Sequence, residues 1–520
     1  MSATNIRALI VPLFRFQLPA GSLIATLFAV VASTSPLYMS LCGQISLRFG
    51  LVAAALAALG AAYLTVATLK PYDIRLAIDL KSLWVAFLFS VVLCLLGGEG
   101  RFFFANVDWE TRDALLNDLV RQHWPFVYEV DGTRLMLRAP LAIYLWPAIA
   151  GKTLSLSAAR FAFLVQNVVL LTCLLGTLQA LFQRFKDRSL LLIVVVFFSG
   201  LDIVGYLFSH VMNGRLSMPD HIEWWSGFQY SSTITQIFWV PHHFFPAAIF
   251  AVMYLLWLDR RAPAGIPLAA IPLLGIWSPL ALIGTLPFGA HTAWSAIRNR
   301  EVKITDLLLP VLSVALSGLC LWYLQSGTEG VPKEFGFPPA MQHPGIRYLL
   351  FLSLELVPFL FLLYASGQHR RFGPWTVHLI AVVLILVPLI RIGEGEDFCM
   401  RASMPALFIL SVLVATRTIS LCHANASIPA RAMCRFSVAI LLLGSVTGML
   451  EMMRALRLDP VTTDCGFVTA WRQSAFAGAS YATYLAKETS MPPLLRPERP
   501  TIVKVANEAG PCWINWEMPK

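Results

Sequence analysis

Apolar runs of roughly membrane-spanning length alternate with short polar connections along most of the chain, from about residue 20 to residue 453. A helix needs about 20 apolar residues to cross the hydrocarbon core of a bilayer, so the pattern predicts an all-α polytopic membrane protein with about thirteen transmembrane helices. The predicted spans are residues 20–42, 50–69, 82–98, 158–182, 189–208, 241–258, 265–277, 278–296, 304–324, 347–366, 374–392, 403–419 and 436–453.

Lysines and arginines gather in alternate connections of this arrangement, which the positive-inside rule assigns to the cytoplasm. The odd number of spans then predicts a cytoplasmic N-terminus and an external C-terminus. The basic residues that share this side are Arg7, Arg15, Lys70, Arg75, Lys81, Arg184, Lys186, Arg188, Arg260, Arg261, Arg298, Arg300, Lys303, Arg370, Arg371, Arg417, Arg431 and Arg435.

The same parity places four longer connections outside, at residues 99–157, 209–240, 325–346 and 393–402. The predicted organisation is therefore a transmembrane domain over residues 1–453, which includes the first external loop at 99–157, followed by a small, loop-rich external region at 454–520.

Composition agrees with this picture, since the mean hydropathy is +0.69 and only 13% of the residues are charged. The net charge of +10 follows from the basic connections and predicts no nucleic-acid partner. Nine cysteines show no CxxC spacing and therefore no metal or redox motif. Cys465 and Cys512 lie in the external tail, where they can form a disulfide if that side is oxidising.

Ionisable residues are concentrated in the first external loop, where seven acids and five arginines lie between Glu99 and Arg138. Asp108 precedes a run whose apolar and acidic residues fall on separate helical faces, so we expect it to cap a helix that lies along the membrane surface. The apolar stretch 139–152 is too short to span and is expected to form a second interfacial element.

Three segments resemble the GT-C superfamily of polytopic membrane glycosyltransferases, in particular uncharacterised bacterial members. They are "NVDWETRDALLNDL" from Asn106, "HIEWWSGFQYSSTITQIFWVPHH" from His221 and "GEDFCMRASMPAL" from Gly395. The resemblance implies a catalytic acid in the first external loop, a polyprenyl-phosphate-linked sugar as donor, and a bacterial inner membrane with that loop and the C-terminus in the periplasm. Membrane lipids are the other expected partners.

Sugar transfer from a lipid phosphate requires a base for the acceptor hydroxyl and a cation for the departing phosphate. Asp108 is the preferred base, with Glu110 and Asp113 as further candidates, because a partly desolvated carboxylate suits proton transfer. Arginine binds phosphate oxygens with two parallel N–H groups, and the candidates for the donor phosphate are Arg401, Arg138 and Arg391. A plain salt bridge between Asp397 and Arg401 is an equally good reading of that pair.

Residues of the later loops are the substrate-binding candidates, because aromatic faces and polar side chains together suit sugar rings. For the tryptophans, an aromatic belt at the membrane interface is the competing reading. No HExxH or similar spacing predicts a metal, although a divalent ion held by the histidines remains a minor alternative. The candidates are His221, Glu223, Trp224, Trp225, Tyr230, His242, His243 and Asp397.

Two other functions remain open from the sequence: a transporter or flippase of lipid-linked sugars, and an O-antigen polymerase-like protein. Asp202 and Glu355 lie inside predicted spans, where ionisable groups usually face a cavity or a partner. No internal repeat supports a transporter, and the dominant external loop comes early rather than late. Phosphate-loop, dinucleotide-binding and serine-hydrolase motifs are absent.

Overall fold

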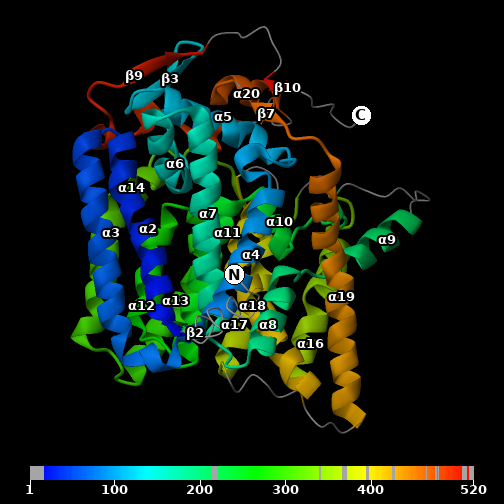
Figure 1. Ribbon diagram of the computed structural model, residues 1–520. Coiled ribbons are helices and arrows are strands. Elements are labelled where there is room, and N and C mark those ends of the chain that lie inside the picture. The colour runs from blue at the N-terminus through cyan, green and yellow to red at the C-terminus, as the bar shows by residue number, and fades with distance from the viewer. Residues whose placement is uncertain are drawn as a thin grey trace, which may run out of the picture.

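The computed structural model describes residues 17–212, 221–338, 341–365, 372–393, 397–423, 428–463, 465–474, 477, 480–505 and 512–514. Within these residues, eight helices are long and apolar enough to cross a membrane, and they stand side by side as an upright bundle (Figure 1). They are α2 (Ala20–Leu41), α3 (Leu47–Leu69), α7 (Leu156–Gln179), α11 (Pro241–Leu258), α13 (Pro279–Arg298), α14 (Ile304–Gln325), α18 (Asp397–His423) and α19 (Ile428–Arg457).

Shorter helices occupy the remaining predicted spans. A ninth crossing is made if α15 and α16, which meet at 46°, form one bent span. Three further apolar helices, over Leu80–Leu96, Gly265–Gly275 and Trp375–Leu389, are below span length. A mostly helical chain with several apolar helices of span length is thus confirmed, and thirteen crossings stay a prediction. The shorter helices of the predicted spans are α4 (Leu80–Leu96), α8 (Phe185–Val196), α9 (Asp202–Met212), α12 (Gly265–Gly275), α15 (Pro344–Glu355), α16 (Val357–Ala365) and α17 (Pro374–Leu386). A further short helix, α10 (Thr233–Trp239), lies in the connection predicted at residues 209–240.

The prediction of one continuous span over residues 189–208 is wrong. The chain breaks between α8 and α9, and α9 projects from the side of the bundle (Figure 1). Asp202, the first residue after the break, is held by polar contacts. Its carboxylate accepts hydrogen bonds from the hydroxyls of Ser199, at 2.8 Å, and Thr447, at 3.0 Å. A buried carboxylate with such partners is satisfied at a helix start and not in the middle of an apolar span.

Burial separates the inner helices from the outer ones. The residues of α11 and α18 are almost all buried, whereas α3 and α14 expose large apolar side chains such as Leu56 and Val311. Apolar side chains exposed over whole helix faces match contact with lipid rather than with water. The core of the bundle therefore lies around α11 and α18.

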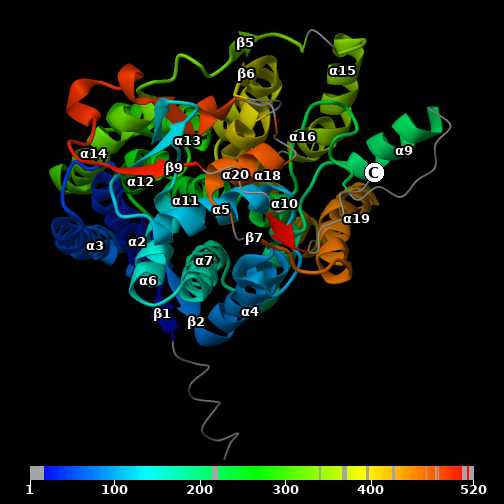
Figure 2. The ribbon, with the colours of Figure 1, turned by 90° about the horizontal axis from the view of Figure 1, so that it is seen from above.

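One end of the bundle carries a folded cap, and we call this end the cap face. It contains α5 (Asp108–Arg121), α6 (Ala142–Thr153), α20 (Phe467–Gln473) and a four-stranded sheet with the order β8-β4-β3-β9. From above, α5 and α20 lie over the middle of the bundle (Figure 2). The strands are β3 (Phe126–Val130), β4 (Thr133–Leu137), β8 (Leu485–Lys487) and β9 (Thr501–Lys504).

The sheet joins the first long loop to the end of the chain. β3 and β4 form a hairpin with Val127 opposite Met136, and its turn at Asp131 and Gly132 has positive φ at both residues, as a type I′ turn requires. β9 pairs with β3 in parallel, with Phe126 opposite Thr501. The expectation of an all-α chain did not include this sheet. Short strand pairs elsewhere are β1 (Gln17–Pro19) with β2 (Ala77–Asp79), β5 (Lys333–Phe335) with β6 (Ile390–Ile392), and β7 (Thr462–Thr463) with β10 (Trp513–Ile514).

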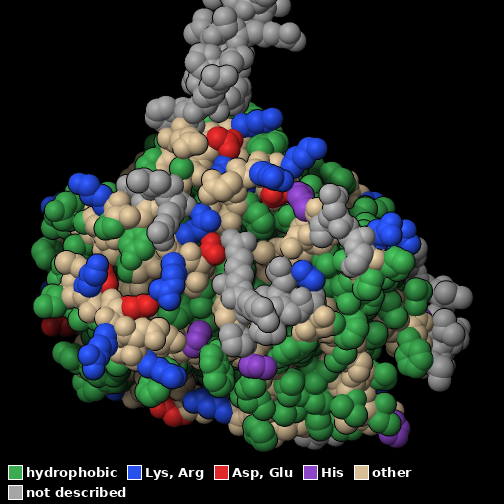
Figure 3. Space-filling model, turned by 90° about the horizontal axis from the view of Figure 1, so that it is seen from below, with side chains coloured by type: hydrophobic (Ala, Val, Ile, Leu, Met, Phe, Trp, Pro, Cys, Tyr) green, Lys and Arg blue, Asp and Glu red, His purple; other side chains and the backbone are tan. Residues whose placement is uncertain are grey.

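A disulfide joins Cys465 to Cys512 within the cap, as the sequence allowed. The opposite end of the bundle, which we call the basic face, has many Lys and Arg side chains, with hydrophobic side chains along its edge (Figure 3). It includes the connection between α13 and α14 and the start of α8. The acid-rich loop and most of the basic connections thus lie at opposite ends.

The first loop contains both expected helices, but α5 is capped and placed differently from the prediction. Asp108 is the first residue of the helix and not its cap; instead, the side-chain oxygen of Asn106 accepts a hydrogen bond from the Asp108 backbone N–H at 3.1 Å. Eleven residues of α5 are buried, from Trp109 to Leu119. The helix is enclosed between α6, α7 and α20 rather than lying on the membrane surface, because its charged face is neutralised by partners in the cap.

Candidate functional site: charged residues beneath the cap

Two acid–arginine pairs lie at the junction of the cap and the bundle, one on α5 and the other on α18. In α5, an Oδ atom of Asp108 lies 2.6 Å from a guanidinium nitrogen of Arg112. In α18, Asp397 and Arg401 repeat the arrangement at 2.6 Å. Each pair spans one helical turn, the spacing at which side chains on one helix face meet. The salt bridge expected as one reading of Asp397 and Arg401 is therefore present.

Tyr484, from the C-terminal segment, brings the two pairs into one electrostatic environment. Burial raises the pKa of its phenol, and the nearby guanidinium groups of Arg112 and Arg401 oppose that rise. The two carboxylates, Asp108 and Asp397, act on the same phenol in the opposite sense. Two segments of the chain, at residues 108–112 and 397–401, thus contribute charges around a single tyrosine.

Two histidines at the start of α11 complete this group. The rings of His242 and His243 are 3.8 Å apart, and both interact electrostatically with Arg112 and Arg401. The ring of Tyr144 in α6 lies 6.3 Å from that of His242. We call these residues the Tyr484 cluster: Asp108, Arg112, Tyr144, His242, His243, Asp397, Arg401 and Tyr484.

Several buried polar atoms of the Tyr484 cluster have no hydrogen-bond partner among the described residues. They are Nε and Nη1 of Arg112, Nε of Arg401, the hydroxyl of Tyr144 and Nδ1 of His242. A buried donor without a partner costs on the order of 1–3 kcal/mol, more when it is charged. Unpaired guanidinium N–H groups side by side with a phenol and an imidazole have the chemistry of a site for an anionic, oxygen-rich ligand.

Exposure distinguishes the three acids that the sequence proposed as bases. The side chain of Asp108 is 19% exposed, whereas that of Asp113 is 2% exposed. Asp113 lies 2.7 Å from Arg101 and 3.0 Å from Arg160, so it joins three segments of the chain through ion pairs. Its geometry is that of a structural link, and Asp108 has the access that a reacting group needs.

The environment of Glu110 differs from those of Asp108 and Asp113. Neither of its carboxylate oxygens has a hydrogen-bond partner among the described residues, and burial, followed by the nearby charge of Asp108, raises its pKa to about 8. The side chain lines a hollow of about 10 Å³ together with Trp109 and Thr463. Such a hollow has room for about one water molecule, so it does not admit a sugar.

The other two arginines proposed for the donor phosphate lie outside the Tyr484 cluster. Arg138 is buried, and its guanidinium donates to the backbone carbonyls of Leu324 and Ala482. Its backbone N–H donates to the carbonyl of Tyr484 at 2.7 Å, so it helps to hold that residue in position. Arg391 pairs with the exposed Glu334 across the β5–β6 strand pair.

A second polar group, the Glu451 cluster, contains the other predicted histidine. Nδ1 of His221 lies 2.7 Å from one carboxylate oxygen of Glu451, and the indole N–H of Trp239 donates to the other at 2.8 Å. Arg454 lies 3.9 Å from the same carboxylate. The cluster is defined by His221, Glu223, Trp239, Glu451 and Arg454.

Glu223 in this cluster is buried and satisfied. Its carboxylate accepts from the amide of Gln229 at 2.8 Å and from the backbone N–H of Ser232 at 2.9 Å. Burial raises its pKa to about 7, against the opposing effect of the nearby His221. Further carboxyl groups lie close by, since Asp202 interacts with both Glu223 and Glu355.

The aromatic residues proposed for sugar binding do not form one surface. Trp224 is 58% exposed and makes edge-to-face contacts with His221 and Trp239. Trp225 and Tyr230 pack instead against Phe351 of α15. The second loop is therefore divided: His242 and His243 belong to the Tyr484 cluster, and the residues from His221 to Tyr230 lie in or beside the Glu451 cluster.

Sequence reasoning did not single out Arg112, Tyr144, Tyr484 or Glu451. Arg112 carried a usable signal, because it follows Asp108 by one helical turn. Tyr484 carried no such signal, since only the long-range β4–β8 pairing brings its segment to the first external loop.

Over the described residues, no group of three or more His, Cys, Asp or Glu side chains has a geometry that holds a metal ion.

No family model, no curated protein and no solved structure matches the chain.

Proposed function

We propose that the protein is an integral membrane glycosyltransferase that moves a sugar from a polyprenyl-phosphate donor to an acceptor hydroxyl at the cap face. The observation that carries the proposal is the set of unpartnered N–H and O–H groups of Arg112, Arg401 and Tyr144 near Asp108, an acid whose side chain is 19% exposed. A phosphate oxygen is the strongest acceptor for paired guanidinium donors. A hydroxyl on the acceptor is the matching partner for a nearby carboxylate.

In this reaction, the acceptor oxygen forms a bond to the anomeric carbon of the donor sugar. The bond from that carbon to the phosphate oxygen breaks, and its electron pair leaves with the polyprenyl phosphate. Asp108 takes the proton of the acceptor hydroxyl. Arg401 and Arg112 neutralise the charge that develops on the phosphate, and His242 and His243 contact the substrate.

The same proposal sets the orientation. The basic face lies in the cytoplasm and the cap face in the periplasm, as expected of a multi-pass protein of the bacterial inner membrane. The disulfide between Cys465 and Cys512 in the cap supports an oxidising compartment on that side. Alkaline phosphatase fused after Asp131 should be active and a fusion after Lys186 inactive; the reverse pattern would reject the orientation.

The test of the reaction uses the purified protein in lipid nanodiscs, with a panel of radiolabelled polyprenyl-phosphate sugars and decaprenyl phosphate as a non-reacting probe. Asp108→Asn should lower the rate of transfer by ~100-fold or more, because it removes the proton acceptor. The same variant should bind decaprenyl phosphate at least as tightly as the parent, since a negative charge next to the phosphate is lost.

The matched control is Asp131→Asn, which removes one carboxylate from an exposed turn of the same cap. It should leave transfer and binding unchanged. Transfer at the parental rate by Asp108→Asn would move the base elsewhere, and loss of decaprenyl phosphate binding together with transfer would show a structural role instead.

A transporter of lipid-linked sugars is the second candidate, and one observation favours it. Buried carboxyl groups at Asp202, Glu223 and Glu355 lie beside the break between α8 and α9 and the bent pair α15–α16. Broken helices with buried acids are typical of proton-coupled transporters. Proton-driven movement of a fluorescent lipid-linked sugar across liposomes, lost in Glu355→Gln and kept in Asp108→Asn, would favour this candidate over the enzyme.

A further inference from the structure

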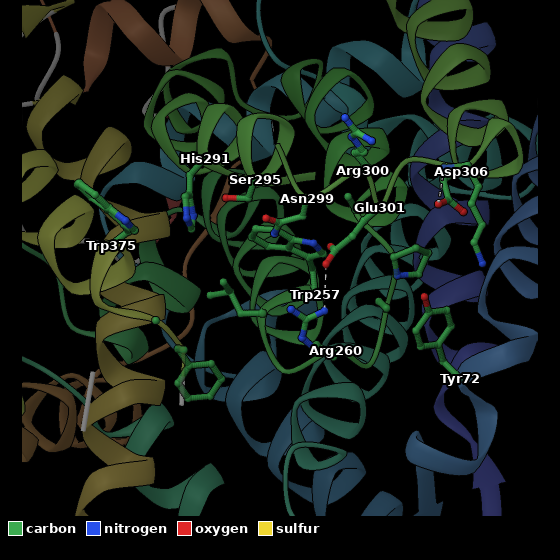
Figure 4. Close-up of a pocket in the computed structure, with 17 residues that line it drawn as sticks. Tyr72, Trp257, Arg260, His291, Ser295, Asn299, Arg300, Glu301, Asp306 and Trp375 are labelled. Atoms are coloured by element: carbon green, nitrogen blue, oxygen red, sulfur yellow. Dashed lines mark hydrogen bonds and ion pairs between the residues drawn. The ribbon is translucent and has the colours of Figure 1, made fainter. Parts of the chain in front are cut away.

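A cavity of about 590 Å³ lies at the connection between α13 and α14, which belongs to the basic face (Figure 4). Residues from the end of α11, from α13, from the start of α14 and from the start of α17 line it. The volume is in the range of sites for small ligands. None of the residues in the proposed reaction contributes to it.

One wall of the cavity is a row of polar side chains on α13 and on the residue that caps its C-terminus. His291, Ser295 and Asn299 follow one another at four-residue intervals, so they share a face of the helix (Figure 4). Aromatic side chains, Trp257 and Trp375, belong to the same lining. The cavity therefore offers hydroxyl, amide and imidazole groups along its length, bordered by rings that suit the boundary between lipid and water.

Three cations, Arg260, Arg300 and Lys303, line the same cavity, and its two acids are already engaged. Glu301 lies 3.1 Å from Arg260. The carboxylate of Asp306 accepts a hydrogen bond from the backbone N–H of Lys303 at the start of α14. Arg300 and Lys303 therefore have no carboxylate partner among the residues that the structure describes.

Both arginines occupy a backbone conformation that is unusual for their residue type. The φ angles of Arg260 and Arg300 are +55° and +54°, in the left-handed region that favours glycine. Each is the second residue after the end of a helix, and the backbone hydrogen bonds from Arg300 to Ile297 and from Glu301 to Ala296 form the ending that usually contains glycine. Two strained arginines at one cavity indicate that their side chains serve a purpose other than ending the helices.

The cavity also borders the surface that faces lipid. Trp294 and Ile297 on α13 and Ile304 on α14 are large apolar side chains with high exposure, and they lie on the helices whose ends carry the cations. A ligand with a phosphate beside Arg300 and Lys303 can extend its hydrocarbon part along these side chains.

We propose that this cavity binds the phosphate headgroup of an anionic phospholipid of the adjacent leaflet. Unpaired cations attract the phosphate, the polar row on α13 receives the hydroxyls of a glycerol headgroup, and the exposed apolar side chains contact the acyl chains. The inference does not depend on the reaction at the cap face, so either one can fail without the other.

The test measures binding to the purified full-length protein in a neutral detergent. The probes are short-chain phosphatidylglycerol, short-chain phosphatidylcholine, and inorganic phosphate. Phosphatidylglycerol should bind at least ten times more tightly than the other two. In the double variant R300G/K303Q, its dissociation constant should rise at least tenfold, while the melting temperature stays the same or rises because the strained φ is relieved at glycine.

Two controls separate the site from general charge and strain effects. R184Q/K186Q removes two exposed cations from the same face outside the cavity, and H343G relieves a left-handed residue elsewhere. Both should bind phosphatidylglycerol as the parent does. Ser295→Trp places a bulky side chain in the cavity without a change of charge. It should weaken the binding of phosphatidylglycerol as strongly as R300G/K303Q does.

Equal affinity of the parent and R300G/K303Q for phosphatidylglycerol would overturn the proposal. Equal weakening by R184Q/K186Q would also overturn it, because it would show attraction by the whole basic face. Binding of inorganic phosphate as tightly as phosphatidylglycerol would reject a lipid in favour of a soluble phosphate ligand.

Discussion

The guanidinium of Arg112 lies 2.6 Å from the carboxylate of Asp108, yet its Nε and Nη1 atoms have no hydrogen-bond partner among the described residues. Arg401 repeats this half-satisfied state in α18, where it pairs with Asp397 and leaves Nε without a partner. Each arginine thus neutralises one carboxylate and retains N–H donors toward the junction of cap and bundle. This is the arrangement expected of groups that share their charge between a protein carboxylate and a ligand.

Loss of the planar guanidinium at Arg401 should weaken donor binding more than catalysis. For Arg401→Lys we expect the KM for the lipid-linked donor to rise roughly 10-fold, since about 1.5–3 kcal/mol is typical of a hydrogen bond to a charged group. Steady-state kinetics in nanodiscs give KM and kcat separately. Arg472→Lys, at an exposed pair with Asp131, is the matched control; a KM unchanged in Arg401→Lys would leave this arginine with its salt bridge alone.

Asp113 should be important for stability rather than for transfer. Asp113→Asn leaves the largely buried side chains of Arg101 and Arg160 without their shared carboxylate. Removal of one partner from a buried ion pair costs about 3 kcal/mol. Thermal unfolding in detergent should therefore show a clear drop in Tm, with transfer per folded molecule unchanged. A parental Tm would contradict the structural role.

The buried carboxyl of Glu110 should make stability depend on pH. Its pKa in the folded chain is about 8, above the value of 4.5 for a free glutamate, so the folded state holds a proton that the unfolded state releases. This contribution is complete below pH 4.5 and is lost as the pH rises to about 8.

Glu110→Gln should remove this dependence of the unfolding free energy on pH. At pH 8 the variant should be more stable than the parent by on the order of a few kcal/mol. Tm measured from pH 5 to pH 8.5 gives the comparison. The control is Glu488→Gln, because Glu488 is a partly exposed acid of the cap. Identical pH profiles for the parent and Glu110→Gln would show that the carboxyl ionises freely.

The disulfide should stabilise the cap. It closes a loop over a sequence separation of 47 residues, for which loop-closure entropy gives about 4 kcal/mol at most. Replacement of both Cys465 and Cys512 by serine should lower the Tm of the cap, and a reductant should lower the parental Tm but not that of the double variant. The double variant Cys42→Ser/Cys94→Ser, which changes cysteines of the bundle, should keep the response to the reductant.

The sequence was sufficient for the helical bundle because span length and apolarity are local properties, and most predicted spans have a helix at the expected place. It failed where a local run depends on a distant partner. The span over residues 189–208 breaks at Asp202, whose hydroxyl partner Thr447 is far along the chain. The sheet was missed for the same reason, since strands of three to five residues carry little periodicity of their own.

The candidate site was predicted in part. Asp108, His242, His243, Asp397 and Arg401 were proposed from the sequence, and the structure brings them together. Their partners Arg112 and Tyr484 were not proposed, because Arg112 was not considered as a partner of Asp108 and the C-terminal region showed no pattern. His221 and Glu223 were placed with the same group but lie with Glu451.

The parallel pairing of Glu129 with Lys504 imposes an order on biosynthesis. Strand β3 emerges early, but its neighbour β9 leaves the ribosome only after almost all of the remaining chain, tens of seconds later at ~5–20 residues per second. During that interval the hairpin has an open edge and the phenol of Tyr484 has not yet arrived. A polypeptide that stops before Tyr484 would contain the helices of the bundle but not the tyrosine that Asp108, Arg112, Asp397 and Arg401 surround, so the Tyr484 cluster is complete only when synthesis has almost ended.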